Sequence, residues 1–175
     1  MTAFLLTGPP GSGKTTLVLE LVRELGVPAG GFVTEEVREG GRRTGFRLVT
    51  LDGRRALLAS VESVSPLRVA RYGVELTGLE TVGVPAIYQA IEGAALVVID
   101  EIGKMELLSE RFREAVLAAL ESGRPVLGTI MLARHPFADA VKARPDVRLL
   151  TLAREERETV RQRLLTELRR ALAGY

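Results

Sequence analysis

The chain lacks several residue types, and each absence removes a class of function. It has no cysteine, which excludes disulfide bonds, thiolate catalysis and cysteine-based metal sites. A single histidine, His135, excludes a histidine-rich metal site. No apolar run approaches the roughly 20 residues of a membrane span, and no basic-then-apolar signal precedes the first strand, so we expect a cytoplasmic protein with no membrane partner.

The chain also has little net charge of either sign. The formal net charge is only +2, although the basic residues are almost all arginines. Nucleic-acid binding usually requires a strong basic stripe, so this weak excess argues against such a partner. With 175 residues, 46% of them hydrophobic, the chain suits one domain over residues 1–175 with a sizeable core.

The order of the periodic segments predicts the fold class. Strands are expected at 3–7, 31–37, 95–99, 125–130 and 147–152, and helices at 14–25, 108–121 and about 155–173. Strands that alternate with helices build a mainly parallel α/β sheet with helices on both faces, which binds its ligand at the carboxyl ends of the strands. A further helix is expected at about 81–92, interrupted near Pro85.

A different pattern occupies residues 38–59. Two short alternating runs are separated by turn residues, which predicts an antiparallel hairpin inserted after the second strand. Arginines cluster at its turns, at Arg42, Arg43, Arg54 and Arg55. We expect them to be solvated; the alternative is a basic rim for phosphates or a partner.

Residues 8 to 15 carry a complete G-x-x-x-x-G-K-[ST] motif between a buried strand and a helix. The motif consists of Gly8, Pro9, Pro10, Gly11, Ser12, Gly13, Lys14 and Thr15, and Thr16 follows it. Such a glycine-rich turn wraps backbone N–H groups around phosphate oxygens. We therefore expect nucleoside triphosphate binding, with Lys14 at the β- and γ-phosphates and the Thr15 hydroxyl on Mg²⁺. A lysine without an anion would oppose the helix dipole at this position.

A second motif is an apolar strand that ends in two carboxylates. It reads Leu96, Val97, Val98, Ile99, Asp100, Glu101, Ile102 and Gly103. The end of a buried parallel strand projects into the crevice that holds the phosphates, so Asp100 is expected to hold Mg²⁺, mostly through water. Glu101 is then the catalytic carboxylate that orients or deprotonates water, with Lys14 stabilising the transferred phosphoryl group.

Several polar residues are weaker candidates. Glu35 and Glu36, near the end of the second strand, are alternatives to Glu101 as the base. Thr129 contacts the γ-phosphate or water, or is simply a strand former. His135 is expected to be a loop or capping residue. Lys104 and Glu106 either pair on the surface or fix the loop that carries Glu101.

The carboxylate beside the metal-binding aspartate favours hydrolysis over transfer to a small molecule. A nucleoside or nucleotide kinase is a further alternative, against which the absence of a clear arginine-rich lid counts. Another alternative is a nucleotide-gated module that contacts a partner through its arginine-rich hairpin. We recognise no arginine finger in the chain, which predicts slow turnover.

These segments together resemble one family. The sequence from Leu6 to Thr16, the stretches 31–38 and 45–53, and above all the D-E-I-G-K-M-E segment at 100–106 are similar to the THEP1 family of nucleoside-triphosphatases. The resemblance covers nearly the whole chain. It implies a RecA-like P-loop NTPase core with an inserted antiparallel hairpin and slow Mg²⁺-dependent hydrolysis of ATP, GTP and other triphosphates. It also implies that the phosphate loop and Leu96–Gly103 bind the nucleotide.

The chain departs from this family at one point. Family members often carry an Asn-Arg pair after the last strand, whereas this chain has no asparagine, and Arg154 or Arg157 would keep the arginine's place. The same absence excludes the Asn-Lys-x-Asp motif of guanine-specific switch proteins, which favours loose base selectivity. Apolar residues on the closing helix serve core packing or an interface; we expect a monomer.

Overall fold

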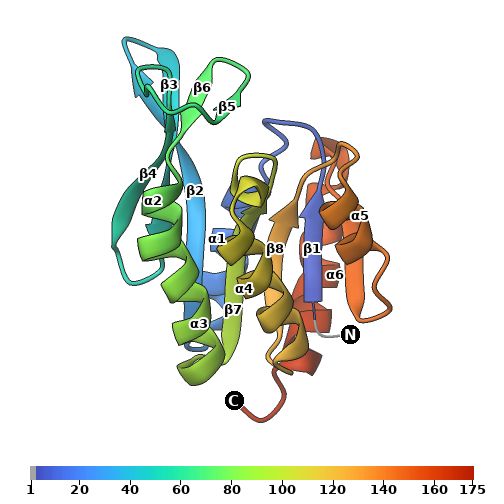
Figure 1. The fold of residues 1–175 in the computed structure, drawn as a ribbon. Coiled ribbons are helices and arrows are strands. Elements are labelled where there is room, and N and C mark those ends of the chain that lie inside the picture. The colour runs from blue at the N-terminus through green and yellow to red at the C-terminus, as the bar shows by residue number, and fades with distance from the viewer. Residues whose placement is uncertain (1–2) are drawn as a thin grey trace.

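The computed structural model describes residues 3–175 as a nine-stranded sheet with helices packed on it. The strands lie in the order β5-β6-β4-β3-β2-β7-β8-β1-β9. They are β1 (Ala3–Thr7), β2 (Ala29–Glu39), β3 (Arg42–Thr50), β4 (Arg55–Ser60), β5 (Arg68–Val69), β6 (Tyr72–Val74), β7 (Leu96–Ile102), β8 (Val126–Ile130) and β9 (Val147–Thr151). Figure 1 shows the sheet with α3 and α4 packed along it and the C-terminus at the lower end.

The helices follow the strands along the chain. They are α1 (Lys14–Leu25), α2 (Leu76–Gly78), α3 (Val84–Gly93), α4 (Glu110–Glu121), α5 (Pro136–Lys142) and α6 (Arg157–Ala171). A π-helical turn, η1 (Leu79–Gly83), and two 3₁₀ turns, η2 (Glu106–Leu108) and η3 (Arg154–Glu156), complete them. None of these helices is both long and apolar enough to cross a membrane.

We call β9, β1, β8, β7 and the first residues of β2 the parallel half, because all of these strands pair in parallel. Successive residues of its strands are buried in opposite layers. Phe4 and Leu6 pack with α1 and α6, whereas Ala3 and Leu5 pack with α3, α4 and α5. A strand covered on both faces is a continuous apolar run, which is the pattern the sequence shows. The predicted α/β fold is therefore confirmed.

The remaining strands form what we call the antiparallel extension: the rest of β2 with β3, β4, β6 and β5. β2 is the link, since Ala29–Phe32 pairs in parallel with β7 and Phe32–Glu39 pairs with β3. The hairpin predicted at about 38–59 is present as β3 and β4, which pair in antiparallel. The antiparallel region extends beyond it, because β2 pairs with β3 and because β6 and β5 follow β4. The sequence did not indicate β5 and β6, which have only two and three residues.

The helix before β7 also differs from the prediction. Residues 76–93 are helical without a break, through α2, η1 and α3. Pro85 lies in the first turn of α3 and does not interrupt the helix. The preceding π-helical turn joins the two segments, and Pro85 follows it as the second residue of α3, where the hydrogen-bonding pattern changes from π-helical to α-helical.

Two helix starts are fixed by capping side chains. The Ser109 hydroxyl accepts a hydrogen bond from the Phe112 N–H at the start of α4. The His135 Nδ1 accepts one from the Phe137 N–H at the start of α5, as predicted for this histidine.

Candidate active site

The phosphate loop connects β1 to α1 through backbone conformations that suit glycine. Gly11 and Gly13 have φ values of 76° and 88°, in the left-handed region. Gly8 has little space, because a Cβ there would lie 2.7 Å from the Leu152 carbonyl oxygen. The loop thereby turns into α1 with the first N–H groups of the helix still free of intrahelical partners, which is the arrangement that binds anions.

Lys14 is the first residue of α1 and folds back over the loop. Its Nζ donates to the carbonyl oxygens of Gly8, at 2.8 Å, and Pro9, at 3.2 Å. These contacts hold a cation above the concave face of the loop. Arriving phosphate oxygens would exchange with the two carbonyls as acceptors.

Asp100 lies near the end of β7 with its carboxylate held by three threonines. The Thr15 hydroxyl donates to Oδ2 at 2.7 Å, and the Thr129 hydroxyl donates to Oδ1 at 2.5 Å. From β2, the Thr34 N–H donates to Oδ2 at 3.4 Å and the Thr34 hydroxyl to the Asp100 carbonyl oxygen at 2.7 Å. Burial raises the pKa of Asp100, and the hydrogen bonds from Thr129 and Thr15 oppose that rise.

The sequence analysis did not identify Thr34 as a hydrogen-bond partner of Asp100. Thr34 directly precedes the two glutamates considered there, so the same carboxyl-end argument would have found it. Thr129 lies in β8, between the strands that carry the loop and Asp100, but its hydroxyl is bonded to Asp100.

Glu101 follows Asp100 and is partly buried at the same edge of the sheet. Burial raises the pKa of Glu101, the Asp100 charge raises it further, and Lys14 opposes both. Unlike Asp100, Glu101 has no side-chain hydrogen-bond partner within residues 3–175. Gly103 leaves space for its carboxylate, since a Cβ at that position would lie 2.7 Å from Oε1.

The alternative glutamates of β2 are both paired. Glu35 accepts a short hydrogen bond from Arg47 on β3. Glu36 forms ion pairs with Arg38 at 2.9 Å and with Arg43 at 3.2 Å. Both carboxylates are thus already occupied by arginine, and although burial raises the pKa of Glu36, the hydrogen bonds from Arg38 and Arg43 lower it overall.

Glu106 contradicts the surface pairing expected for it with Lys104. Its side chain is 4% exposed, and its Oε2 has no hydrogen-bond partner in the described part of the chain. Burial raises the pKa of Glu106 well above its ordinary value, and the Glu101 charge adds to this. The η2 turn carries Glu106 inward next to the buried Leu107, whereas Lys104 stays exposed.

Two arginines follow the last strand and take different places. The Arg154 guanidinium donates to the Gly11 carbonyl oxygen of the phosphate loop at 3.1 Å. Arg157 forms an ion pair with Glu20 of α1 at 2.8 Å. Arg154 is therefore the arginine that lies at the loop.

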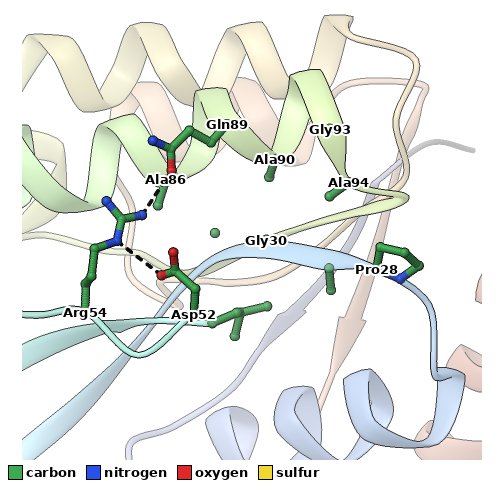
Figure 2. A pocket seen from close by; sticks show the side chains of 12 residues that line it. Pro28, Gly30, Asp52, Arg54, Ala86, Gln89, Ala90, Gly93 and Ala94 are labelled. Carbon is green, nitrogen blue, oxygen red and sulfur yellow. Dashed lines mark hydrogen bonds and ion pairs between the residues drawn. The ribbon is translucent and has the colours of Figure 1, made fainter.

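Two of the hollows formed by residues 3–175 border β2, and only one of these two contains phosphate-loop residues and buried carboxylates. A cavity of about 720 Å³ at the carboxyl ends is lined by Lys14, Thr15, Thr34, Asp100, Glu101 and Glu106, among others. Figure 2 shows the second, of about 330 Å³, at the start of β2, where Arg54 bonds to Asp52 and Gln89. It has no phosphate loop and no buried carboxylate, so the larger cavity is the candidate active site.

The glycine loop joins β1 to α1, the acidic end belongs to β7, and β8 lies between β1 and β7. This arrangement defines the P-loop NTPase class. Comparisons with known proteins agree with this class. The sequence profile of the family described as NTPase matches residues 3–165. A crystal structure of THEP1 from the hyperthermophile Aquifex aeolicus superposes with a TM-score of 0.87 at 36% identity, covering 95% of this chain and 98% of that one.

Sequence relatives narrow the class to a family. Nucleoside-triphosphatase THEP1 of Thermotoga sp. (strain RQ2) is 45% identical over 94% of each chain. The cancer-related nucleoside-triphosphatase of Homo sapiens is 44% identical, covering 87% of this chain and 88% of the human protein. The chain belongs to the THEP1 family of nucleoside-triphosphatases. The predicted family and the predicted hydrolase class are thereby confirmed.

Proposed function

We propose that the chain hydrolyses nucleoside triphosphates in the larger cavity and that Glu101 activates the attacking water. The observation that carries this proposal is the contrast among the carboxylates of the cavity. Asp100 is bonded to three threonines, and Glu35 and Glu36 are paired with arginines. Glu101 keeps its carboxylate free of side-chain partners beside Asp100 and has a raised pKa, which suits a group that accepts a proton.

The phosphate loop binds the triphosphate in this proposal. Loop N–H groups and the N-terminus of α1 receive the phosphate oxygens, and Lys14 moves from the Gly8 and Pro9 carbonyls to the β- and γ-phosphates. Because negative charge grows on these oxygens during transfer, a fixed ammonium and fixed amides stabilise the transition state more than the ground state.

The site also has the donors that Mg²⁺ requires. Thr15 and Asp100 supply a hydroxyl and a carboxylate, and oxygen ligands of this type are those that Mg²⁺ prefers. The Thr15 hydroxyl lies 2.7 Å from Asp100 Oδ2, so both groups would be within reach of one ion, directly or through its bound water. When bound, the ion would neutralise charge on the β- and γ-phosphates.

The reaction then needs one proton transfer. The water oxygen attacks the γ-phosphorus while its proton passes to the Glu101 carboxylate. The bond between the γ-phosphorus and the bridging oxygen breaks, and the nucleoside diphosphate leaves with that oxygen. Asp100 stays ionised and Lys14 remains with the transferred phosphoryl group.

We propose slow turnover and loose base selectivity, with ATP, GTP and other triphosphates as substrates. Arg154 is bonded to a loop carbonyl rather than pointing freely at the phosphates, so it does not act as a preformed arginine finger. The absence of asparagine removes one motif for guanine recognition. We further propose that the protein is a cytoplasmic monomer without a nucleic-acid partner.

The test compares Glu101→Gln with Glu35→Gln and Glu36→Gln in steady-state phosphate release from MgATP and MgGTP. We expect Glu101→Gln to lower kcat by about 10²- to 10⁴-fold, the usual contribution of a general base, while nucleotide affinity persists. Glu35→Gln and Glu36→Gln should stay within a few-fold of the parent. A parental rate in Glu101→Gln, or a larger loss in either of the other two, would contradict the assignment.

A further inference from the structure

The candidate active-site cavity is larger and less polar than phosphate binding requires. It continues from the loop to the antiparallel extension, whose strands β3, β4, β5 and β6 contribute Phe46, Leu58, Val69 and Tyr72. Its volume of about 720 Å³ lies within the range of small-molecule sites, which combine apolar walls with a few polar groups. One end of this cavity thus resembles an organic ligand site.

This apolar end has a built aromatic wall. The rings of Phe46 and Tyr72 lie 5.1 Å apart in an edge-to-face arrangement. The Arg43 guanidinium lies over both rings, 5.1 Å and 5.7 Å from their centroids, and donates to the Tyr72 hydroxyl at 2.8 Å. With Glu36 on its other side at 3.2 Å, Arg43 holds the wall in one arrangement.

A strained residue borders the same wall. Ala70, in the turn between β5 and β6, has a φ of 51°, which a residue with a side chain adopts only at a cost of about 1 kcal/mol or more. Ala70 contributes to the cavity lining together with Val69. Such conformations concentrate at ligand sites, where the surrounding structure maintains them.

The position of the wall relates it to the reaction, on the basis of the proposed function. Lys14 lies with the β- and γ-phosphates, and Asp100 and Glu101 lie at the γ-phosphate end. In phosphoryl transfer the attacking and leaving oxygens are roughly in line with the phosphorus. Phe46 and Tyr72 line the same cavity as Asp100 and Glu101 but lie on the antiparallel extension, so their end of the cavity is open to an acceptor that approaches the γ-phosphate.

The charges around the cavity narrow the class of ligand. Its lining contains three cations, Lys14, Arg43 and Lys104, and five carboxylates, Glu35, Glu36, Asp100, Glu101 and Glu106. Arg43 is already paired with Glu36, and Lys14 is assigned to the triphosphate. A second phosphate-bearing molecule would meet excess negative charge there, whereas an uncharged planar molecule would bury apolar surface on the rings.

We propose that the apolar end binds an uncharged, planar heterocycle with a hydroxyl group, of about nucleoside size, as a phosphoryl acceptor. Its hydroxyl oxygen attacks the γ-phosphorus in place of water, and the hydroxyl proton passes to Glu101. The bond from the γ-phosphorus to the bridging oxygen breaks, so the products are a nucleoside diphosphate and a phosphate monoester. Hydrolysis is the reaction that remains when the acceptor is absent.

The experiment uses the full chain and a panel of uncharged nucleosides: adenosine, guanosine, cytidine, uridine and thymidine. Saturation-transfer NMR with MgADP present measures binding, and γ-³²P-labelled ATP measures the division of label between inorganic phosphate and ester. We expect at least one nucleoside to bind saturably and to carry label, with a matching fall in released phosphate. If none binds, or if one binds and carries no label, the inference is wrong.

Matched variants locate the site. Phe46→Leu keeps a folded apolar wall but removes the ring, and Tyr72→Phe keeps the ring but removes the hydroxyl bond to Arg43. We expect Phe46→Leu to weaken nucleoside binding at least tenfold, with a smaller loss in Tyr72→Phe. Arg71→Ala is the control, since Arg71 stacks on the same Tyr72 ring and is not part of the cavity lining. Equal nucleoside affinity in Phe46→Leu and the parent would overturn the inference.

A control reaction without nucleoside separates this inference from the proposed function. If the parent releases phosphate and Glu101→Gln does not, the proposed function stands whatever the nucleosides do. If phosphate release itself is insensitive to Glu101→Gln, the assignment of Glu101 fails independently of the nucleoside result.

Discussion

The two parts of the sheet differ in how they are covered and in what their side chains do. Every residue of β1 and β8 in the parallel half is buried, and helices cover both faces. The antiparallel extension has exposed positions in β2 and β3 and is bonded across its strands by arginine–glutamate pairs. In Figure 1 β3, β5 and β6 rise at one end of the sheet, away from the helices that cover the other strands.

The comparison indicates that the parallel half supplies rigidly packed elements, whereas the antiparallel extension supplies ligand contacts. The parallel half holds Lys14 and Asp100 on packed elements, where catalytic geometry is best maintained. Exposed ion pairs contribute little stability, typically below ~1 kcal/mol each, so the stability of the extension depends mainly on the small hydrophobic cluster packed around Tyr72. We expect damage to the parallel half to abolish chemistry and damage to the extension to change what binds.

The largest effect is expected from a substitution in the phosphate loop, which belongs to the parallel half. Lys14→Ala removes the cation that stabilises charge on the phosphates, so kcat/KM for MgATP should fall by at least about 10²- to 10³-fold. Arg169→Ala, at an exposed position of α6, is the control and should match the parent in the same phosphate-release assay. Loss of less than threefold in Lys14→Ala would show that the loop binds phosphate without its lysine.

A glycine pair then compares the stability of the two parts. A Cβ at Gly128 would lie 2.2 Å from the Ile99 carbonyl oxygen in the parallel half, and one at Gly45 would lie 2.3 Å from the Ala59 carbonyl oxygen in the extension. Alanine at either position should lower the free energy of unfolding by about 1–3 kcal/mol, measured by urea titration. The two variants should differ in which strands lose protection against unfolding.

Hydrogen exchange distinguishes them. We expect Gly128→Ala to reduce amide protection throughout the parallel half, because β8 is the middle one of its five strands. Gly45→Ala should reduce protection mainly in β3 and β4. Uniform loss of protection in both variants would mean that the two parts unfold as one unit.

These contrasts reflect what the sequence could and could not reveal. The phosphate loop and the acidic end of β7 are contiguous segments whose local order carries their chemistry, so both were recognisable without a structure. Phe46 and Tyr72 meet across strands with short or irregular patterns, and nothing in either segment indicates the other. Of the two alternatives for Glu106, pairing with Lys104 on the surface is wrong, because tertiary packing carries this carboxylate inside although a charged residue in a short turn is usually exposed.

A smaller effect is expected from Thr129→Val, which keeps the shape and removes the hydroxyl that donates to Asp100. Asp100 is 2% exposed, so its carboxylate loses a partner that water does not readily replace. We expect kcat to fall about tenfold, equivalent to ~1.4 kcal/mol. Thr81→Val, whose hydroxyl donates to a carbonyl on the exposed side of a helix, serves as the control.

The smallest effect concerns pH and stability. The pKa of Glu106 is raised well above its unfolded value, so the native state is favoured below the unfolded pKa and loses that advantage as pH rises through the folded pKa. Glu106→Gln removes this titration. Its Tm relative to the parent should therefore be higher at pH 8 than at pH 5 in the absence of nucleotide, measured by calorimetry. Glu62→Gln, on an exposed turn, should show no such change; an equal Tm difference at both pH values in Glu106→Gln would contradict a buried titration.

Strand β2 connects the candidate active site to the antiparallel extension. Thr34 bonds to Asp100, while the next two residues, Glu35 and Glu36, hold Arg47 and Arg43 of the extension. Three consecutive residues of one strand thus carry a hydrogen-bond partner of Asp100 and, through Glu36 and Arg43, a contact to the aromatic wall. A displacement of the wall along β2 would therefore bear directly on the Thr34 hydrogen bonds to Asp100.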